Sequence, residues 1–189
     1  MWRREAPAAA ALSTGFPALD AVLPDAGWPL GALTEILVPR EGAGELRLVM
    51  PALAELGARG RWLAWIGAPH VPYAPALEAR GVPLSRILWV RSDHPAEQLW
   101  SAEQVLRSGI CGAVLAWPGR VPPRRLRRLQ LAAESGGAWA VLFRDDPSSE
   151  QGSPASLRLR VTPADRGLAV QVRKCRGRPG ARVEIDLDE

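Results

Sequence analysis

The sequence has no long hydrophobic run, only two cysteines and a single lysine. No apolar stretch approaches the roughly 18 residues that a membrane-spanning helix needs, so we expect no membrane partner. Cys111 and Cys175 have no second cysteine or histidine at the spacing of a metal site, and they indicate no disulfide framework. The alanine run near the start is too short and too weak for a secretory signal. We therefore expect a cytoplasmic protein that holds no metal.

What the sequence does contain is typical of one globular domain. The chain has 189 residues, of which 47% are hydrophobic and 23% are charged. This balance differs from that of disordered chains and of membrane proteins, and the length suits one well-buried core. We predict an N-terminal tail at residues 1–12 and a single domain at residues 13–189.

Positive charge is concentrated in the C-terminal third. The net charge is −1 over residues 1–116, +9 over residues 117–182 and −4 over the last seven residues, which gives the overall +4. Every cation except Lys174 is an arginine, the side chain suited to bidentate contacts with phosphate or carboxylate. A GC-rich coding sequence produces the same preference, so the position of the charge carries more weight than the choice of arginine.

Short apolar runs alternate with helical patterns over most of the chain. The predicted strands cover residues 33–38, 61–66, 86–90, 112–117 and 138–143. The predicted helices cover residues 16–23, 46–56, 74–80, 92–108 and 124–135, and Pro51 predicts a kink or a late start in the second of them. Continuous apolar strands that alternate with helices indicate a parallel sheet covered on both faces.

The pattern changes after a polar segment at residues 145–156. Leucine, valine and isoleucine then recur at every second position, around residues 157–161, 168–172 and 183–187. This period predicts three antiparallel strands that extend the sheet, with a hairpin turn at residues 165–167. The predicted fold class is therefore α/β, with a mostly parallel sheet, helices on both faces and antiparallel C-terminal strands.

The chain is organised around residues 33–56, where a strand, a glycine-containing turn and a helix follow one another. This is the frame of a phosphate-binding loop, in which backbone amides hold phosphates, a lysine reaches them and a serine or threonine binds Mg²⁺. The best alignment to that motif uses the segment Pro39, Gly42, Gly44, Glu45 and Leu46, with Glu45 in place of the lysine and Leu46 in place of the hydroxyl residue. A carboxylate about 4 Å from a phosphate charge costs roughly 4 kcal/mol. We therefore expect no nucleotide cofactor, and the alternative is a strand and a core helix without any ligand.

These segments together resemble the RecA-like ATPase core. The similarity runs through LSTGFPALDAVL, GWPLGALTEI, PREGAG, RWLAWIGAPH and GAVLAW. The resemblance places the catalytic glutamate of that family near Pro69 and its metal-binding aspartate on Trp117. Neither residue can activate water or hold Mg²⁺, so the resemblance implies a RecA-like fold without enzymatic activity. Trp65 and Trp117, near the carboxyl ends of their strands, are expected to fill a former nucleotide pocket.

A narrower resemblance is to the ImuA branch of this superfamily. It rests on TGFPALDAVLP, GWPLGALTEIL, WPGR and KCRGRPG. The related SulA family shares the middle of the chain, through GALTEILVPRE, PALAELG, RWLAW and GVPLSRI. The SulA family is not expected to share the complete N-terminal segments TGFPALD and GWPLG or the basic C-terminal segment. Their presence here favours the ImuA branch.

The ImuA resemblance implies a role in the SOS-type DNA damage response, in error-prone translesion synthesis and mutagenesis. Its implied partners are an ImuB-like Y-family polymerase homologue, an alternative replicative-type polymerase, RecA and DNA. The function expected from it is a non-catalytic adaptor. One alternative is a SulA-like inhibitor of cell division that blocks polymerisation of a filament-forming GTPase. Another is a weak nucleotide-binding enzyme with an unconventional site.

Two arginine-rich segments are the candidate binding surfaces. In the first, helical spacing places arginines on one solvent-facing ridge while Leu126 and Leu129 face the sheet. The second lies between two predicted strands. Phosphate backbone or an acidic protein would suit both segments, and solvated surface is the alternative for each. The candidate residues are Arg120, Arg124, Arg125, Arg127 and Arg128 in the first segment and Arg173, Lys174, Arg176 and Arg178 in the second.

Ser92, Asp93 and His94 have the residue types of a catalytic triad but are consecutive in the chain. Adjacent side chains cannot align as nucleophile, base and orienting group. We interpret them as the cap of the following helix, with Glu97 close to the position that bonds back to it.

Overall fold

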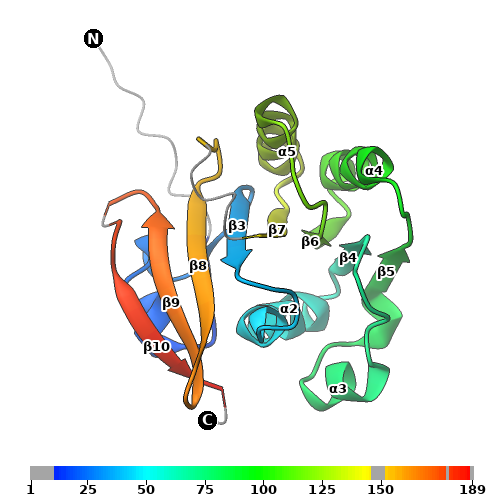
Figure 1. Cartoon of the computed structure of the whole chain (residues 1–189). Coiled ribbons are helices and arrows are strands. Elements are labelled where there is room, and N and C mark those ends of the chain that lie inside the picture. Colours follow the sequence, from blue (N-terminus) through cyan, green and yellow to red (C-terminus); the bar gives the residue numbers. More distant parts are fainter. Residues whose placement is uncertain (1–10, 146–151, 178, 188–189) are drawn as a thin grey trace.

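The computed structural model describes residues 11–145, 152–177 and 179–187, and these form a layered α/β structure (Figure 1). The strands of its large sheet are β3 (Leu33–Val38), β4 (Trp62–Ile66), β5 (Ile87–Val90), β6 (Cys111–Ala116), β7 (Trp139–Asp145), β8 (Leu157–Ala164), β9 (Gly167–Lys174) and β10 (Arg182–Asp186). Their order across the sheet is β10-β9-β8-β3-β7-β6-β4-β5.

Helices cover both faces of this sheet. Figure 1 shows α2 (Glu45–Ala58) and α3 (Ala74–Ala79) on one face and α4 (Pro95–Ser108) and α5 (Pro123–Gly136) on the other. A short 3-10 helix, η2 (Leu84–Arg86), precedes β5. The residues that build the central strands are buried on both sides, as their continuous apolar sequences predict. The predicted fold class is therefore confirmed.

Two hydrophobic cores lie on the two faces of the sheet. The core beneath α2 includes Ile36, Leu48, Leu53 and Trp65. The core beneath α4 and α5 includes Leu33, Ile66, Leu126 and Leu129. None of the helices in the described ranges combines the length and the apolar character needed to cross a membrane.

The C-terminal strands join the sheet in a way that the sequence pattern does not reveal. β8 pairs with β3 in parallel, whereas β9 is antiparallel to both β8 and β10. Each of the three strands is antiparallel to the next one in the chain, as predicted, and β9 is the strand that runs against the rest of the sheet. The predicted hairpin turn is confirmed, since β8 and β9 are joined at Asp165 and Arg166.

The N-terminal boundary needs a correction. Ala11 and Leu12 form β1 (Ala11–Leu12), which pairs antiparallel with β2 (Trp28–Pro29), although both residues were predicted to lie in the tail. Leu12 is buried in the core beside Trp28, and this burial explains why residues 11 and 12 belong to the folded domain. Residues 1–10 lie outside the described residues. The domain therefore begins at least two residues earlier than predicted.

Two helix predictions are also corrected. The helix predicted at residues 16–23 is shortened to α1 (Pro17–Asp20), and the 3-10 helix η1 (Pro24–Ala26) follows it. The Asp20 carboxylate accepts hydrogen bonds from the Ser13 hydroxyl (2.7 Å) and the Thr14 amide (2.9 Å), so it holds the entry to this turn. α2 does not start late at Pro51, because it begins at Glu45 and includes the proline.

Candidate functional site

The phosphate-loop frame is present in the structure. β3 ends at Val38, residues 39–44 form the loop, and α2 begins at Glu45. Gly44, at the N-cap of α2, has φ of 96°, a left-handed conformation that favours glycine. A Cβ atom at Gly44 would also lie 3.1 Å from the Leu168 side chain, so close packing gives a second reason for glycine.

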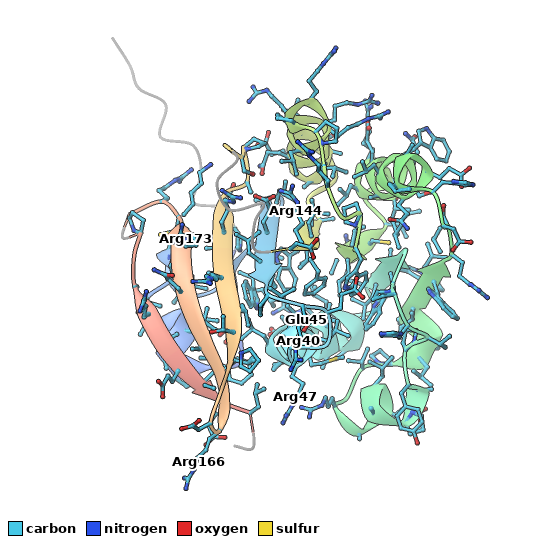
Figure 2. All side chains as sticks on the ribbon, viewed as in Figure 1. Arg40, Glu45, Arg47, Arg144, Arg166 and Arg173 are labelled. Atoms are coloured by element: carbon cyan, nitrogen blue, oxygen red, sulfur yellow. The ribbon has the colours of Figure 1, made fainter. Side chains whose placement is uncertain are left out.

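Glu45 turns its carboxylate into its own loop. Its Oε1 atom accepts a hydrogen bond from the backbone amide of Gly42 (3.0 Å), and the residue is only 4% exposed. A carboxylate of the chain itself is therefore hydrogen-bonded to a loop amide of the kind that binds phosphate in a phosphate-binding loop. Figure 2 shows Glu45 at the start of α2, with Arg40 in the preceding loop. Leu46 follows Glu45 and packs partly buried against the core.

Aromatic side chains fill the space beside this loop, at the carboxyl ends of the parallel strands. Trp117, directly after β6, stacks on Phe143 of β7 with ring centroids 4.8 Å apart. Its ring also lies 5.9 Å from that of Trp65 on β4. The predicted placement of both tryptophans at this edge is confirmed.

A small cavity lies next to the loop. Its volume is about 90 Å³, whereas pockets for small-molecule ligands usually measure about 300–1,000 Å³. Its lining includes Glu41, Glu45, Trp117, Arg144 and Asp145. Three carboxylates against one guanidinium make this lining unfavourable for phosphate groups.

The structure also places the potential metal-ligating side chains and the two cysteine thiols. In the part of the chain that the structure describes, no group of three or more His, Cys, Asp or Glu side chains could hold a metal ion. Cys111 and Cys175 are both free thiols. Burial raises the pKa of the Cys111 thiol, and the positive charge of Arg61 opposes that increase in part. A thiol with a raised pKa is a poor nucleophile.

Sequence reasoning missed a buried ionic cluster between three strands. Glu35 of β3 forms an ion pair with Arg144 of β7, and its Oε2 atom lies 2.7 Å from Nε of Arg158 on β8. All three side chains are more than nine-tenths buried. Glu35 and Arg158 are direct neighbours in the parallel pairing of β3 and β8. The available signal was a charged residue, Glu35, within a mostly apolar strand.

The arginine ridge has the orientation that helical spacing predicts. Arg124, Arg127 and Arg128 on α5 are exposed and Arg125 is half-buried, while Leu126 and Leu129 are buried against the sheet. Arg120, in the loop before α5, is also exposed. The binding role of this ridge stays a prediction.

One member of the ridge is engaged within the chain. Arg128 Nη2 donates a hydrogen bond to Glu103 Oε1 of α4 at 2.8 Å, and Arg107 of α4 lies 3.6 Å from the same oxygen. Glu103 is buried between the two helices. The ridge is therefore continuous with the outer surface of α4.

The second basic segment lies at a different place on the sheet. Arg173 and Lys174 end β9, and both are exposed, as is Arg176. The Lys174 ammonium donates a hydrogen bond to the backbone carbonyl of Ser153 (2.6 Å). Figure 2 shows Arg173 at the end of β9 opposite Arg166. Arg178 lies outside the described residues.

The structure does not merge the two basic segments into one site. α5 packs on β3 and β7, whereas β9 is separated from β3 by β8. The two segments are therefore treated as separate candidate surfaces.

The prediction that Ser92 and Asp93 cap α4 is wrong, because the N-cap of α4 is His94 and it makes no side-chain cap hydrogen bond. Ser92 lies two residues before this N-cap. Its hydroxyl donates to Glu97 Oε2 (2.9 Å) and accepts from the His94 amide (3.2 Å). These contacts tie the first turn of α4 to the segment before it, and the Ser92 hydroxyl donates to the Glu97 carboxylate rather than to His94 as a catalytic base.

Comparisons with known proteins match this chain to two related groups. A family model described as "Cell division inhibitor SulA" matches residues 31–140, which run from just before β3 into β7. Protein ImuA of Caulobacter vibrioides is 31% identical over 199 residues, a match that covers 91% of this chain and 82% of the relative.

The SulA relatives match a shorter part of the chain. Cell division inhibitor SulA of Edwardsiella piscicida is 35% identical over 96 residues, which cover 51% of this chain and 57% of the relative. The protein of the same name from Yersinia enterocolitica is 26% identical over 137 residues, which cover 71% of this chain and 82% of the relative. Strands β8, β9 and β10 lie beyond the residues that the family model matches.

Proposed function

Because this chain belongs to the SulA family, and within it is a homologue of Protein ImuA, we propose that it is a non-catalytic adaptor of the SOS-type DNA damage response. It acts in the cytoplasm by binding proteins of error-prone translesion synthesis. The observation that carries the proposal is the position of the Glu45 carboxylate. It accepts a hydrogen bond from the Gly42 amide of the loop and places a negative charge where a nucleotide would place a phosphate group.

Two further features of the same edge support binding without catalysis. The resemblance to RecA-like ATPases assigns Trp117 to the position of their metal-binding aspartate, and the Trp117 ring stacks on Phe143. Pro69, near the position of their catalytic glutamate, has no side chain that can accept a proton. With neither an acid nor a metal ligand at these positions, we infer that this edge performs no phosphate hydrolysis.

The surface that remains for binding is the arginine ridge of α5, with the segment Arg173–Arg178 as a second candidate. Exposed guanidinium groups suit acidic protein surfaces and phosphate backbones. The proposed partners are an ImuB-like Y-family polymerase homologue, then RecA and an alternative replicative-type polymerase. DNA is a further candidate for the same arginines.

A pull-down from DNA-damaged cells of the source organism, followed by mass spectrometry, tests this proposal. The tagged chain should recover the polymerase homologue. A variant with Arg124, Arg125, Arg127 and Arg128 all changed to Ala should recover much less of it.

The matched control removes four exposed arginines elsewhere, with Arg40, Arg59, Arg80 and Arg166 all changed to Ala. Equal loss in both variants would show a general effect of charge and would contradict the assigned surface. Recovery of none of the proposed partners by the unmodified chain would contradict the adaptor function.

The SulA family match supports a second candidate function, the inhibition of cell division. In that case the division GTPase should appear in the pull-down and overexpression should arrest septation. Recovery of the GTPase in equal amounts by the ridge variant would place that interface elsewhere and would leave the ridge as solvated surface.

A further inference from the structure

A groove runs between the outer surfaces of α4 and α5, which pack side by side on one face of the sheet (Figure 1). Its volume is about 230 Å³. Arg107, Glu103, Arg128 and Leu131 contribute to its lining, together with Ala132 and Ser135. The groove shares no lining residue with the small cavity beside the loop at residues 39–44. It shares only Arg128 with the arginine ridge of α5.

The two arginines of this groove form ion pairs with the buried Glu103 side chain. The Glu103 side chain, 4% exposed, lies between Arg128 at 2.8 Å and Arg107 at 3.6 Å. The arginine side chains remain 52% and 63% exposed respectively. One carboxylate neutralises one of the two charges, so the groove keeps a net positive charge and guanidinium groups that reach solvent. A held guanidinium loses less side-chain entropy when it binds a partner carboxylate.

An apolar side chain lies in the same groove. Leu131 is 50% exposed although it belongs to the lining. On α4, Trp100 is 57% exposed and stands one helical turn before Glu103, on the same side of the helix. Exposed large apolar groups next to arginine are typical of the anchoring part of protein interfaces.

The combination favours an acidic protein segment over a nucleic acid. A phosphate backbone would contact the arginines, but it would leave the apolar side chain of Leu131 uncovered. A helix with acidic residues beside leucines would pair with Arg107 and Arg128 and would cover Leu131.

We propose that the groove between α4 and α5 binds an acidic amphipathic helix of a protein partner, with Leu131 as the apolar anchor and Arg107 and Arg128 as the charge contacts. This inference rests on the proposed adaptor function and names the chemistry of its partner segment. It extends the binding surface from the ridge of α5 to α4.

Fluorescence anisotropy with synthetic probes tests the groove directly. The first probe is a labelled amphipathic helix with leucines on one face and glutamates beside them. The second is a peptide of the same composition in scrambled order, and the third is single-stranded oligothymidine. The full chain should bind the amphipathic helix at least about tenfold more tightly than the scrambled peptide, a difference of about 1.4 kcal/mol.

Two variants identify the contacts. Leu131→Asp should weaken binding of the amphipathic helix by about tenfold or more, because an interface anchor is replaced by a charge of the same sign as the probe. Val71→Asp, at an apolar position 69% exposed on a distant loop, is the matched control and should change nothing. Arg107→Glu should weaken binding of the acidic probe. The same substitution should strengthen binding of a probe that has lysines in place of the glutamates. Circular dichroism confirms that each variant is folded.

Several results would overturn the inference. These are equal binding of the ordered and scrambled peptides, no effect of Leu131→Asp, binding of no peptide, or Arg107-dependent binding of oligothymidine alone. The last would assign the groove to nucleic acid.

The proposed function fails independently of these results. If the pull-down recovers the polymerase homologue equally with the unmodified chain and with Leu131→Asp, the adaptor function stands and the groove is refuted. If the probe binds as predicted but no such partner is recovered, the groove stands and the adaptor function is refuted.

Discussion

At the scale of single residues, Glu45 links the stability of the loop to the proposed absence of nucleotide chemistry. The Glu45 side chain is buried, and its carboxylate accepts a partly buried hydrogen bond from the Gly42 amide. Glu45→Ala would leave that amide without its acceptor, which should lower the free energy of unfolding by about 1–2 kcal/mol. Glu45→Gln keeps an oxygen at the same place and should cost less than half of that. Urea titration of both variants measures the difference, and equal stability of Glu45→Ala and the unmodified chain would show that the contact is unimportant.

The cluster of Glu35, Arg144 and Arg158 makes a second prediction at this scale. Glu35→Ala leaves two buried guanidinium groups without their shared carboxylate, so the free energy of unfolding should fall by about 3–5 kcal/mol. Replacing the whole cluster with apolar residues (Glu35→Leu, Arg144→Met and Arg158→Met) should restore most of the loss, because no charge is then left buried alone.

Urea titration of the single and the triple variant separates the two effects. A triple variant less stable than Glu35→Ala would mean that the ion pairs themselves stabilise the fold. Sequence alone could not show this cluster, because the three residues are far apart in the chain and only the pairing of β3 with β7 and β8 brings them together.

At the scale of elements, α5 has a buried face that packs on the sheet and an exposed face that carries the proposed binding residues. Leu126 is buried against the sheet, whereas Leu131 is half exposed in the groove. Leu126→Ala should therefore lower the free energy of unfolding by about 2–5 kcal/mol through lost burial and a cavity. Leu131→Ala should change it by less than about 0.5 kcal/mol, as exposed positions usually do. Thermal or urea unfolding of the pair checks this, and a similar cost at both positions would contradict the assigned faces.

Most elements of this fold could be predicted from the sequence because each has a strong local signal. Strands β3 to β7 are short and mostly apolar runs, and the long helices have apolar faces, with a proline at the start of α4 and of α5. The direction of β8 had no such signal. A period of two identifies a strand and its buried face, but the partner strand and its direction depend on long-range pairing.

The site was predictable in part for the same reason. The alignment to a phosphate loop placed Glu45 correctly beside the loop, and helical spacing placed the arginines of α5 on its exposed side. Sequence could not show that the Glu45 carboxylate turns inward to the Gly42 amide, or that Arg128 is shared with Glu103 of α4. Both contacts depend on the backbone and packing of the folded chain.

At the scale of the whole molecule, the strand, loop and helix frame of a phosphate-binding loop is present while the space beside the loop, at the carboxyl edge of the parallel strands, is filled. The interior at that edge is occupied by Trp117, Phe143 and Trp65. Positive charge instead lies on the outer helices and at the end of β9. This arrangement suits a protein that works through its outer surface, and it requires that partner binding should not depend on nucleotide.

The most direct test is equilibrium binding of the purified chain to the ImuB-like polymerase homologue of the same organism, with and without Mg²⁺ and a non-hydrolysable ATP analogue. Our account predicts a complex whose Kd is the same in both conditions and rises when the four arginines of α5 are replaced by alanine. A complex that forms only with the nucleotide, or no complex in either condition, would contradict it.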